Sequence, residues 1–263
     1  MTTRSAGIGA GIGWLMNAVD LGRNNPKAVF GGGALMILVL FAMVIALSLA
    51  TAPFESSNPD PSVILGSMFI AMLPVVFVMA AMMVGFLRLI DAVESGRPAS
   101  AGNVFAGFHD WPASLRAIGF VILLAIIQNV VLVGLVAMLA PDFGSWYLQN
   151  LQGTLSGHPQ PPPTTLPAGF GATMAVLFVL NLFFYALQAI GLGQIALRGS
   201  GVAKAFKDGA AGAIKNLLPM LVFVLTLLVA VIVLGVGVAL IAGFLMLLGK
   251  GIGMWIVALV GIP

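Results

Sequence analysis

The chain has 263 residues, of which 60% are hydrophobic and 7% are charged. Because soluble proteins carry about 25% charged residues, a water-soluble domain of this length could not bury so much apolar surface. The net charge of +3 does not indicate a nucleic-acid partner, since the eleven basic residues are scattered between apolar blocks. The chain has no cysteine, which excludes disulfides, thiolate metal sites and cysteine nucleophiles.

This composition predicts an all-α, polytopic transmembrane bundle. The first 28 residues are glycine-rich and carry charged side chains, so they lack the compact apolar core of a signal peptide, and we expect the first span to direct insertion. Four apolar stretches each hold the roughly 20 residues that a spanning helix needs. In chain order they are 29–50, 63–89, 117–140 and 172–197.

A further apolar stretch, 217–263, holds 47 residues, and only Lys250 interrupts it. Its length predicts two spans joined by a turn in the glycine-rich segment Gly235–Gly243. These two spans would be 217–236 and 243–262. The alternative is one long tilted helix that ends near Gly249, followed by a short re-entrant tail. The preferred interpretation is six spans in a single membrane domain, 1–263.

Basic residues in short loops mark the cytoplasmic side of a membrane protein. Ten of the eleven Lys and Arg residues precede the first span, flank the second connection or lie in the fourth. They are Arg4, Arg23, Lys27, Arg88, Arg97, Arg116, Arg198, Lys204, Lys207 and Lys215. The first loop, 51–62, and the third, 141–171, contain acidic residues but no Lys or Arg. With six spans, this asymmetry predicts that both termini are cytoplasmic.

The outer loop 141–171 has two parts. Apolar and aromatic residues recur at helical spacing from Phe143 to Leu151, which predicts an interfacial helix at headgroup depth. The proline-rich segment 159–165 is typical of polyproline II. We interpret it as a stiff, solvated connector, with a docking strip for a partner outside the membrane as the alternative.

Three segments on the predicted cytoplasmic side share a plan, in which a weakly amphipathic stretch and a proline or polar stop precede a span. They cover residues 14–25, 104–115 and 202–215. One helical face of the second would carry Val104, Phe108, Trp111 and Leu115, and one face of the third Val202, Phe206, Ala210, Ala213 and Leu217. We predict elbow helices on the membrane surface, each introducing a two-span hairpin of a loosely threefold bundle.

Each predicted elbow helix carries an aspartate near a basic residue. The pairs are Asp20 with Arg23, Asp110 with Arg116, and Asp208 with Lys215. We interpret them as surface pairs worth a few tenths of a kcal/mol each, with a ring of sites for lipid headgroups as the alternative. The candidate headgroup contacts are Arg23, Lys27, Arg88, Arg116, Lys207 and Lys215. Arg88 is also expected to snorkel and so to anchor the end of the second span at the interface.

Several short motifs stand at the ends of the predicted spans. They are Gly13-Trp14 to Asn25-Pro26, Met82-Met83-Val84-Gly85 to Arg88, Gly96-Arg97-Pro98, Phe105-Ala106-Gly107-Phe108, and Lys215-Asn216-Leu217-Leu218-Pro219. Over most of the chain, these motifs resemble an uncharacterised family of bacterial inner-membrane proteins. The plan also looks like the membrane domains joined to some glycerophosphodiester phosphodiesterases. The resemblance implies six spans and an inner-membrane location but no activity, and the catalytic residues of a phosphodiesterase have no counterpart here.

The sequence contains no nucleotide-binding, hydrolase or zinc-protease motif, so we expect no catalytic, metal-binding or cofactor-binding residue and no cofactor. Polar side chains within spans are more informative, because placing them in lipid is costly unless they are paired. Candidates for such a polar seam are Gln128, Asn129, Asn181 and Gln188. They are interpreted as interhelical hydrogen bonds, with a path for a lipid headgroup or small amphiphile as the alternative.

The missing chemistry and the Gly- and Met-rich helix faces favour a non-enzymatic scaffold or accessory subunit of an inner-membrane assembly. Its partners would be membrane lipids, other inner-membrane proteins or further copies of the chain. One alternative is a protein that binds or passively transports lipids or small hydrophobic molecules. A membrane enzyme acting on lipids would have to use His109-Asp110, the one adjacent pair of histidine and carboxylate in the sequence. A channel is a further alternative.

Overall fold

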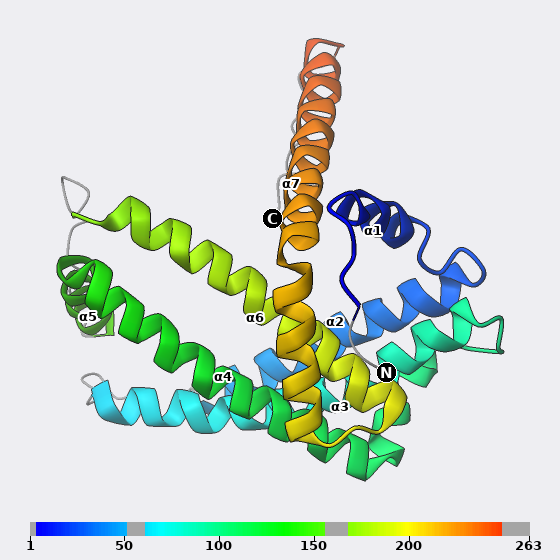
Figure 1. Cartoon of the computed structure of the whole chain (residues 1–263), viewed down its shortest axis with the longest axis horizontal. Coiled ribbons are helices and arrows are strands. Elements are labelled where there is room, and N and C mark those ends of the chain that lie inside the picture. The colour runs from blue at the N-terminus through cyan, green and yellow to red at the C-terminus, as the bar shows by residue number, and fades with distance from the viewer. Residues whose placement is uncertain (1–3, 52–60, 156–167, 249–263) are drawn as a thin grey trace. The chain divides into compact units, whose positions relative to one another are not determined.

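The computed structural model describes residues 4–51, 61–155 and 168–248, and all regular structure within these ranges is helical (Figure 1). In chain order the elements are α1 (Ala10–Val19), α2 (Pro26–Thr51), α3 (Pro61–Glu94), the 3₁₀ helix η2 (Ala101–His109), α4 (Trp111–Leu139), α5 (Pro141–Leu155), α6 (Phe170–Arg198) and α7 (Val202–Leu248). Among the described residues, α2, α3, α4, α6 and α7 are long and apolar enough to cross a membrane. The prediction of an all-helical, multi-span protein is therefore confirmed.

The first four predicted spans correspond to α2, α3, α4 and α6, and the helices extend furthest beyond them where the charged residues lie. The helix α3 continues past Leu89 to Glu94, and α4 begins at Trp111, six residues before Ala117. Hydropathy marks only the part of a helix that lipid can surround, whereas backbone hydrogen bonding continues until a cap ends it.

The turn predicted between Gly235 and Gly243 is wrong, because α7 continues through this segment to Leu248. Glycine is tolerated within membrane helices, and an unbroken helix satisfies the backbone groups of this segment by itself. The first residues of the predicted sixth span, 243–262, therefore belong to α7. Lys250 and the rest of that span lie outside the described residues.

The chain divides into two compact units. Unit 1 comprises Met1–Ser5 and Asp20–Leu217, and unit 2 comprises Ala6–Val19 and Leu218–Pro263. Within unit 2, α1 packs closely against α7, since a Cβ atom added at Gly11 would lie 2.3 Å from the carbonyl oxygen of Pro219. The first predicted elbow helix, 14–25, has the wrong bounds, because α1 ends at Val19 and a turn follows.

That turn leads directly into α2. Gly22 adopts a left-handed conformation with φ of 80°, which glycine reaches without steric cost. The side chain of Asn25 accepts a hydrogen bond from the backbone nitrogen of Ala28 at 3.2 Å, and Pro26 is the first residue of the helix. This is the expected chemistry of a helix start. Asn25 also donates to the carbonyl oxygen of Ala99 at 2.9 Å, which ties the start of α2 to the segment after α3.

The second predicted elbow helix, 104–115, is wrong as a single helix. Its first part is η2 and its second part is the beginning of α4. Val104 is fully buried, whereas about half of the Trp111 and Leu115 surfaces is exposed, so these residues do not share one face. Instead of lying as an isolated surface helix, η2 packs against α2 and α3.

Two glycines let the backbones of η2 and α3 touch. A Cβ atom at Gly107 would lie 1.9 Å from the carbonyl oxygen of Ala81, and one at Gly85 would lie 2.1 Å from the carbonyl oxygen of Val104. No L side chain fits at either position without moving the backbone. This contact fixes the position of η2 and therefore the place where α4 begins.

The third predicted elbow helix, 202–215, is continuous with the span that follows it. Its buried residues include Ala205, Gly209 and Ala213, of which only Ala213 lies on the predicted face, and the larger Val202, Phe206 and Leu217 of that face are only partly buried. A Cβ atom at Gly209 would lie 2.8 Å from the carbonyl oxygen of Leu187, so this part of α7 packs closely on α6. Small residues are buried here because they let the backbones of the two helices approach closely.

The buried side chains of unit 1 gather where these helix ends meet, a region that we call the basic end. It consists of the start of α2, the end of α3, η2, the start of α4, the end of α6 and the start of α7. The apolar residues at its centre include Ala28, Val29, Met36, Met82, Leu89, Val93, Val104, Phe120 and Ile195. The described basic residues before Leu217 lie in or beside this region.

The other parts of α2 and α4, residues 37–49 and 122–139, are called the distal parts. Their large side chains are mostly exposed, among them Leu38, Phe41, Ile45, Leu49, Ile126, Val130, Val133 and Met138. Beyond them, the helix predicted from Phe143 to Leu151 is confirmed as part of α5, while its position at the membrane interface stays a prediction, and Phe143 packs against Phe170 of α6 with ring centroids 5.2 Å apart. The proline-rich segment 159–165 lies outside the described residues.

Candidate functional site

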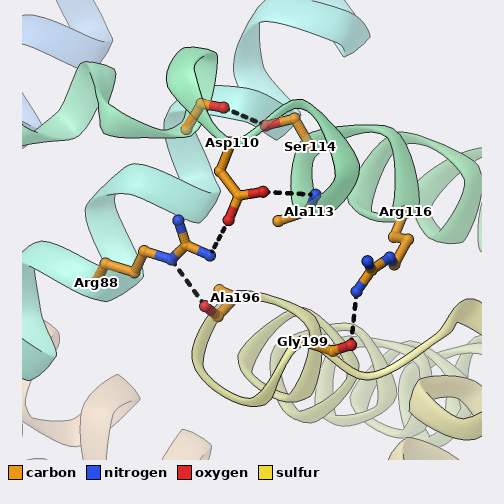
Figure 2. A network of polar contacts seen from close by, with 8 residues as sticks. Arg88, Asp110, Ala113, Ser114, Arg116, Ala196 and Gly199 are labelled. Atoms are coloured by element: carbon orange, nitrogen blue, oxygen red, sulfur yellow. Dashed lines mark hydrogen bonds and ion pairs between the residues drawn. The ribbon is translucent and has the colours of Figure 1, made fainter.

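The candidate site is a polar network at the basic end, where α3, α4 and α6 meet (Figure 2). At its centre lies Arg88 of α3. The Nε atom of Arg88 donates to the carbonyl oxygen of Ala196 at 2.8 Å, and its Nη2 atom pairs with Oδ2 of Asp110 at 2.6 Å. One guanidinium group thus joins the end of α3 to the end of α6 and to the residue that starts α4.

Asp110 occupies the N-cap of α4, and the local sequence explains why the helix starts there. Aspartate is a preferred N-cap residue, and Pro112 in the first turn lacks an N–H group that would have no helical partner. The Oδ1 atom of Asp110 accepts a hydrogen bond from the backbone nitrogen of Ala113 at 3.2 Å. The hydroxyl of Ser114 donates to the carbonyl oxygen of Gly107 at 2.6 Å, which ties α4 to η2.

A second arginine lies at the end of α6. The Nη1 atom of Arg116 donates to the carbonyl oxygen of Gly199 at 2.6 Å, and Gly199 is the left-handed C-cap residue with φ of 61°. Arg88 and Arg116 thus donate to two carbonyl oxygens at the end of α6, where the last carbonyl groups of a helix have no partner within the helix. The helix dipole favours cations at this end, as it favours Asp110 at the start of α4.

The hydrogen bond from Arg88, with a smaller contribution from the backbone of Ala113, holds the pKa of Asp110 below its ordinary value of 3.8. Burial opposes these two hydrogen bonds and raises the pKa, whereas the positive charges of Arg88 and Arg116 lower it further by smaller amounts. About a third of each partner's side chain is exposed, 34% for Arg88 and 37% for Asp110, so the pair borders on solvent. The carboxylate is therefore ionised at neutral pH and bonded through both oxygens.

Two expectations for these residues are wrong. The aspartate of the second connection pairs with Arg88 of α3 and not with Arg116, whose side chain reaches α6. Arg88 does not snorkel freely at the interface either, since it bonds to two neighbouring segments. Both differences arise because η2 folds back on α3 and brings Asp110 to Arg88, a contact 22 residues apart in the sequence.

The six candidate headgroup contacts do not form one cluster. Arg88 and Arg116 meet at the end of α6. Arg23 and Lys27 are exposed near the start of α2, and the remaining two, Lys207 and Lys215, are exposed along α7. Each lies at the basic end, but the network already uses one guanidinium nitrogen of Arg116 and two of Arg88.

Only two of the four residues of the predicted polar seam are hydrogen-bonded to one another. Gln128 of α4 donates through Nε2 to Oδ1 of Asn181 in α6 at 3.4 Å, so these two candidates do meet. Asn129 is exposed, and its amide donates to the carbonyl oxygen of Ala125 in its own helix at 2.8 Å. Gln188 is half-buried two turns along α6 from Asn181 and has no hydrogen bond to the other three candidates. The interhelical contact is thus one pair, Gln128–Asn181.

Sequence reasoning missed the partners of the two arginines, because Ala196 and Gly199 act through backbone carbonyl groups that no side-chain pattern reveals. One available signal was Asp110 followed by Trp111-Pro112, which is a typical helix start and would have placed the beginning of α4. The role of Gly85 and Gly107 could not be inferred, since each depends on a neighbour in the folded chain.

Within the described ranges, no three His, Asp or Glu side chains are placed to share a metal ion. The carboxylate of Asp110, next to the exposed His109, is bonded to Arg88 and to the start of α4. No protein-family model, curated protein or solved structure matches the chain. The interpretation of the site therefore depends on its own geometry.

Proposed function

We propose that this chain is a non-enzymatic integral membrane protein that acts as a scaffold or accessory subunit of a membrane assembly. The observation that carries the proposal is the contrast within unit 1. Its partly buried charged side chains, Arg88 and Asp110, are bonded to one another and to helix ends. Its distal parts expose long apolar faces, which are available to lipid and to other membrane helices.

For the orientation, we propose that the basic end faces the cytoplasm and that the protein resides in a bacterial inner membrane. Support comes from the ten basic residues at or before Lys215 and from the resemblance of the short motifs to a family of bacterial inner-membrane proteins. In this proposal, α7 is the fifth span. The predicted sixth span and the predicted cytoplasmic C-terminus involve residues after Leu248, which lie outside the described residues.

Single cysteines test this orientation cleanly, because the chain has none of its own. Gln149→Cys in α5 should react with a membrane-impermeant maleimide added outside intact cells. Lys204→Cys at the basic end should react only after the cells are opened. Both positions are exposed in the structure. The reverse pattern of labelling would overturn the proposed orientation.

The scaffold proposal is tested by extracting the tagged chain with its surrounding lipid and measuring co-purifying proteins by quantitative mass spectrometry. We expect a protein partner at a constant ratio to the chain. The recovery of that partner should fall when the exposed face of α2 is trimmed by Phe41→Ala with Ile45→Ala, and it should persist in the control Lys204→Gln. Recovery of the chain alone, or with lipid alone, would contradict the proposal.

The pair Gln128–Asn181 favours a second candidate function, the binding or passive transport of lipids or small hydrophobic molecules. Exposed amide groups between two membrane helices can orient a polar headgroup while the apolar chain remains in lipid. Asn181→Leu with Gln188→Leu should then reduce lipid retained in native mass spectrometry. Thr226→Val is the matched control, since that hydroxyl bonds within its own helix. Equal retention by both variants would exclude this site.

A further inference from the structure

The distal part of α4 exposes a seam of residues at the spacing of a coiled coil. Ile122, Ile126, Asn129 and Val133 are separated by four, three and four residues, and all four are exposed. This is the 3.5-residue repeat that faces a partner helix in left-handed packing, which is also common between membrane helices. Gln128, one residue away, turns instead towards α6 and bonds to Asn181.

The polar member of this seam lies near the middle of the span. Asn129 is ten residues before Leu139, the end of α4, and 13 residues after Arg116 of the basic end. At 1.5 Å per residue these separations are about 15 Å and about 20 Å, which places Asn129 close to the centre of a hydrocarbon core about 30 Å thick. Water is absent at that depth, so polar groups need partners from protein.

The hydrogen bonds of Asn129 are incomplete in the single chain. Its amide nitrogen donates to Ala125 of the same helix, and among the described residues its side-chain oxygen accepts no hydrogen bond. A carboxamide has two donor hydrogens and an acceptor oxygen, so it can bond reciprocally to an identical group. An asparagine at one inward position of a coiled coil sets register and helix number by pairing with itself.

We propose that this seam is the interface for a second copy of the chain, with α4 packed against α4 of the other copy and Asn129 bonded to its counterpart. Two copies inserted in the same orientation present Asn129 at the same depth, and a twofold axis along the membrane normal brings the two seams together. The inference deepens the proposed scaffold function, on which it rests, by naming one partner.

Two valines provide a matched test in the cysteine-free chain. Val133 lies on the seam and Val130 lies beside it, and their exposed fractions are almost equal, 67% and 68%. Val133→Cys and Val130→Cys are oxidised in native membranes and compared on non-reducing gels. We expect Val133→Cys to form a disulfide-linked dimer of twice 27.1 kDa, with at least about five-fold less from Val130→Cys. Equal cross-linking of the two, or none, would overturn the proposal.

The role of Asn129 is tested in the Val133→Cys background. Asn129→Leu should lower the cross-linked fraction several-fold, whereas Asn129→Gln, which keeps the carboxamide, should retain most of it. Cross-linking unchanged by Asn129→Leu would refute pairing through this residue. Co-expression of two differently tagged copies identifies the partner, since both tags must appear in the linked species. A linked species with one tag and a foreign protein would reject the second copy but leave the scaffold function standing.

Discussion

At the basic end of unit 1, the backbones of neighbouring segments touch, and arginines bond the exposed ends of helices. In the distal parts of α2 and α4, the same helices show apolar side chains with few neighbours from the chain itself. Lipid can solvate an apolar side chain but cannot bond a carbonyl oxygen or separate two charges. The basic end therefore depends on contacts made within the chain, whereas the distal parts are available for lipid or for other helices.

The largest effect is expected from filling the contact between η2 and α3. Gly107→Ala places a methyl group 1.9 Å from the carbonyl oxygen of Ala81, so the two backbones must separate. We expect a loss of about 2–3 kcal/mol in the free energy of unfolding, measured by thermal or denaturant unfolding in detergent. Gly134→Ala in the distal part of α4 is the control, because its Cβ would meet open space. Similar losses in both variants would remove the distinction between the two regions.

A smaller loss is expected from Arg88→Met. The substitution keeps the length of the side chain but leaves the Asp110 carboxylate without its ion pair and the Ala196 carbonyl without its donor. Since an unsatisfied partly buried group costs about 1–3 kcal/mol, we expect a loss of about 2 kcal/mol. Arg97→Met removes the more exposed ion pair with Asp91 and should cost less than about 1 kcal/mol. If Arg97→Met proved the more damaging change, the network would not stabilise the basic end.

The ion pair also predicts a pH dependence. Because folding lowers the pKa of Asp110, its contribution to stability is fully present above the unfolded pKa of about 4 and is lost as the pH falls through the lower folded value. Asp110→Asn keeps a good N-cap but has no titrating group. Its unfolding midpoint should therefore change less than that of the unmodified chain between about pH 5 and about pH 2. If the unfolding midpoints of the two proteins changed equally with pH, the titration of Asp110 would not contribute to stability.

The smallest effect is expected in the distal parts. Gln128→Leu removes the hydrogen bond to Asn181, which should cost about 0.6 kcal/mol, the usual size of such a bond between membrane helices. A double-mutant cycle with Asn181→Leu isolates this interaction from changes in packing. A coupling energy as large as the loss in Arg88→Met would mean that the distal parts are stabilised as strongly as the basic end.

The sequence alone determined that the chain is helical and spans a membrane, because those properties depend on composition and on the length of apolar runs. It located α2, α3, α4 and α6 within a few residues, and it identified α5 from the spacing of its aromatic residues. It also singled out Arg88, Arg116, Gln128 and Asn181, since charged or amide side chains are conspicuous in an apolar chain. These are local properties that need no knowledge of neighbours.

The tertiary structure decided how these residues are used. The pairing of Asp110 with Arg88 and the caps on Ala196 and Gly199 require η2 to fold back on α3, which only the backbone contacts of Gly85 and Gly107 make possible. Likewise, the small buried residues of the third connection turned a predicted surface helix into the first part of α7. Contacts between distant backbones carry no side-chain signature in the sequence, so periodicity predicted the helices but not which of their ends would meet.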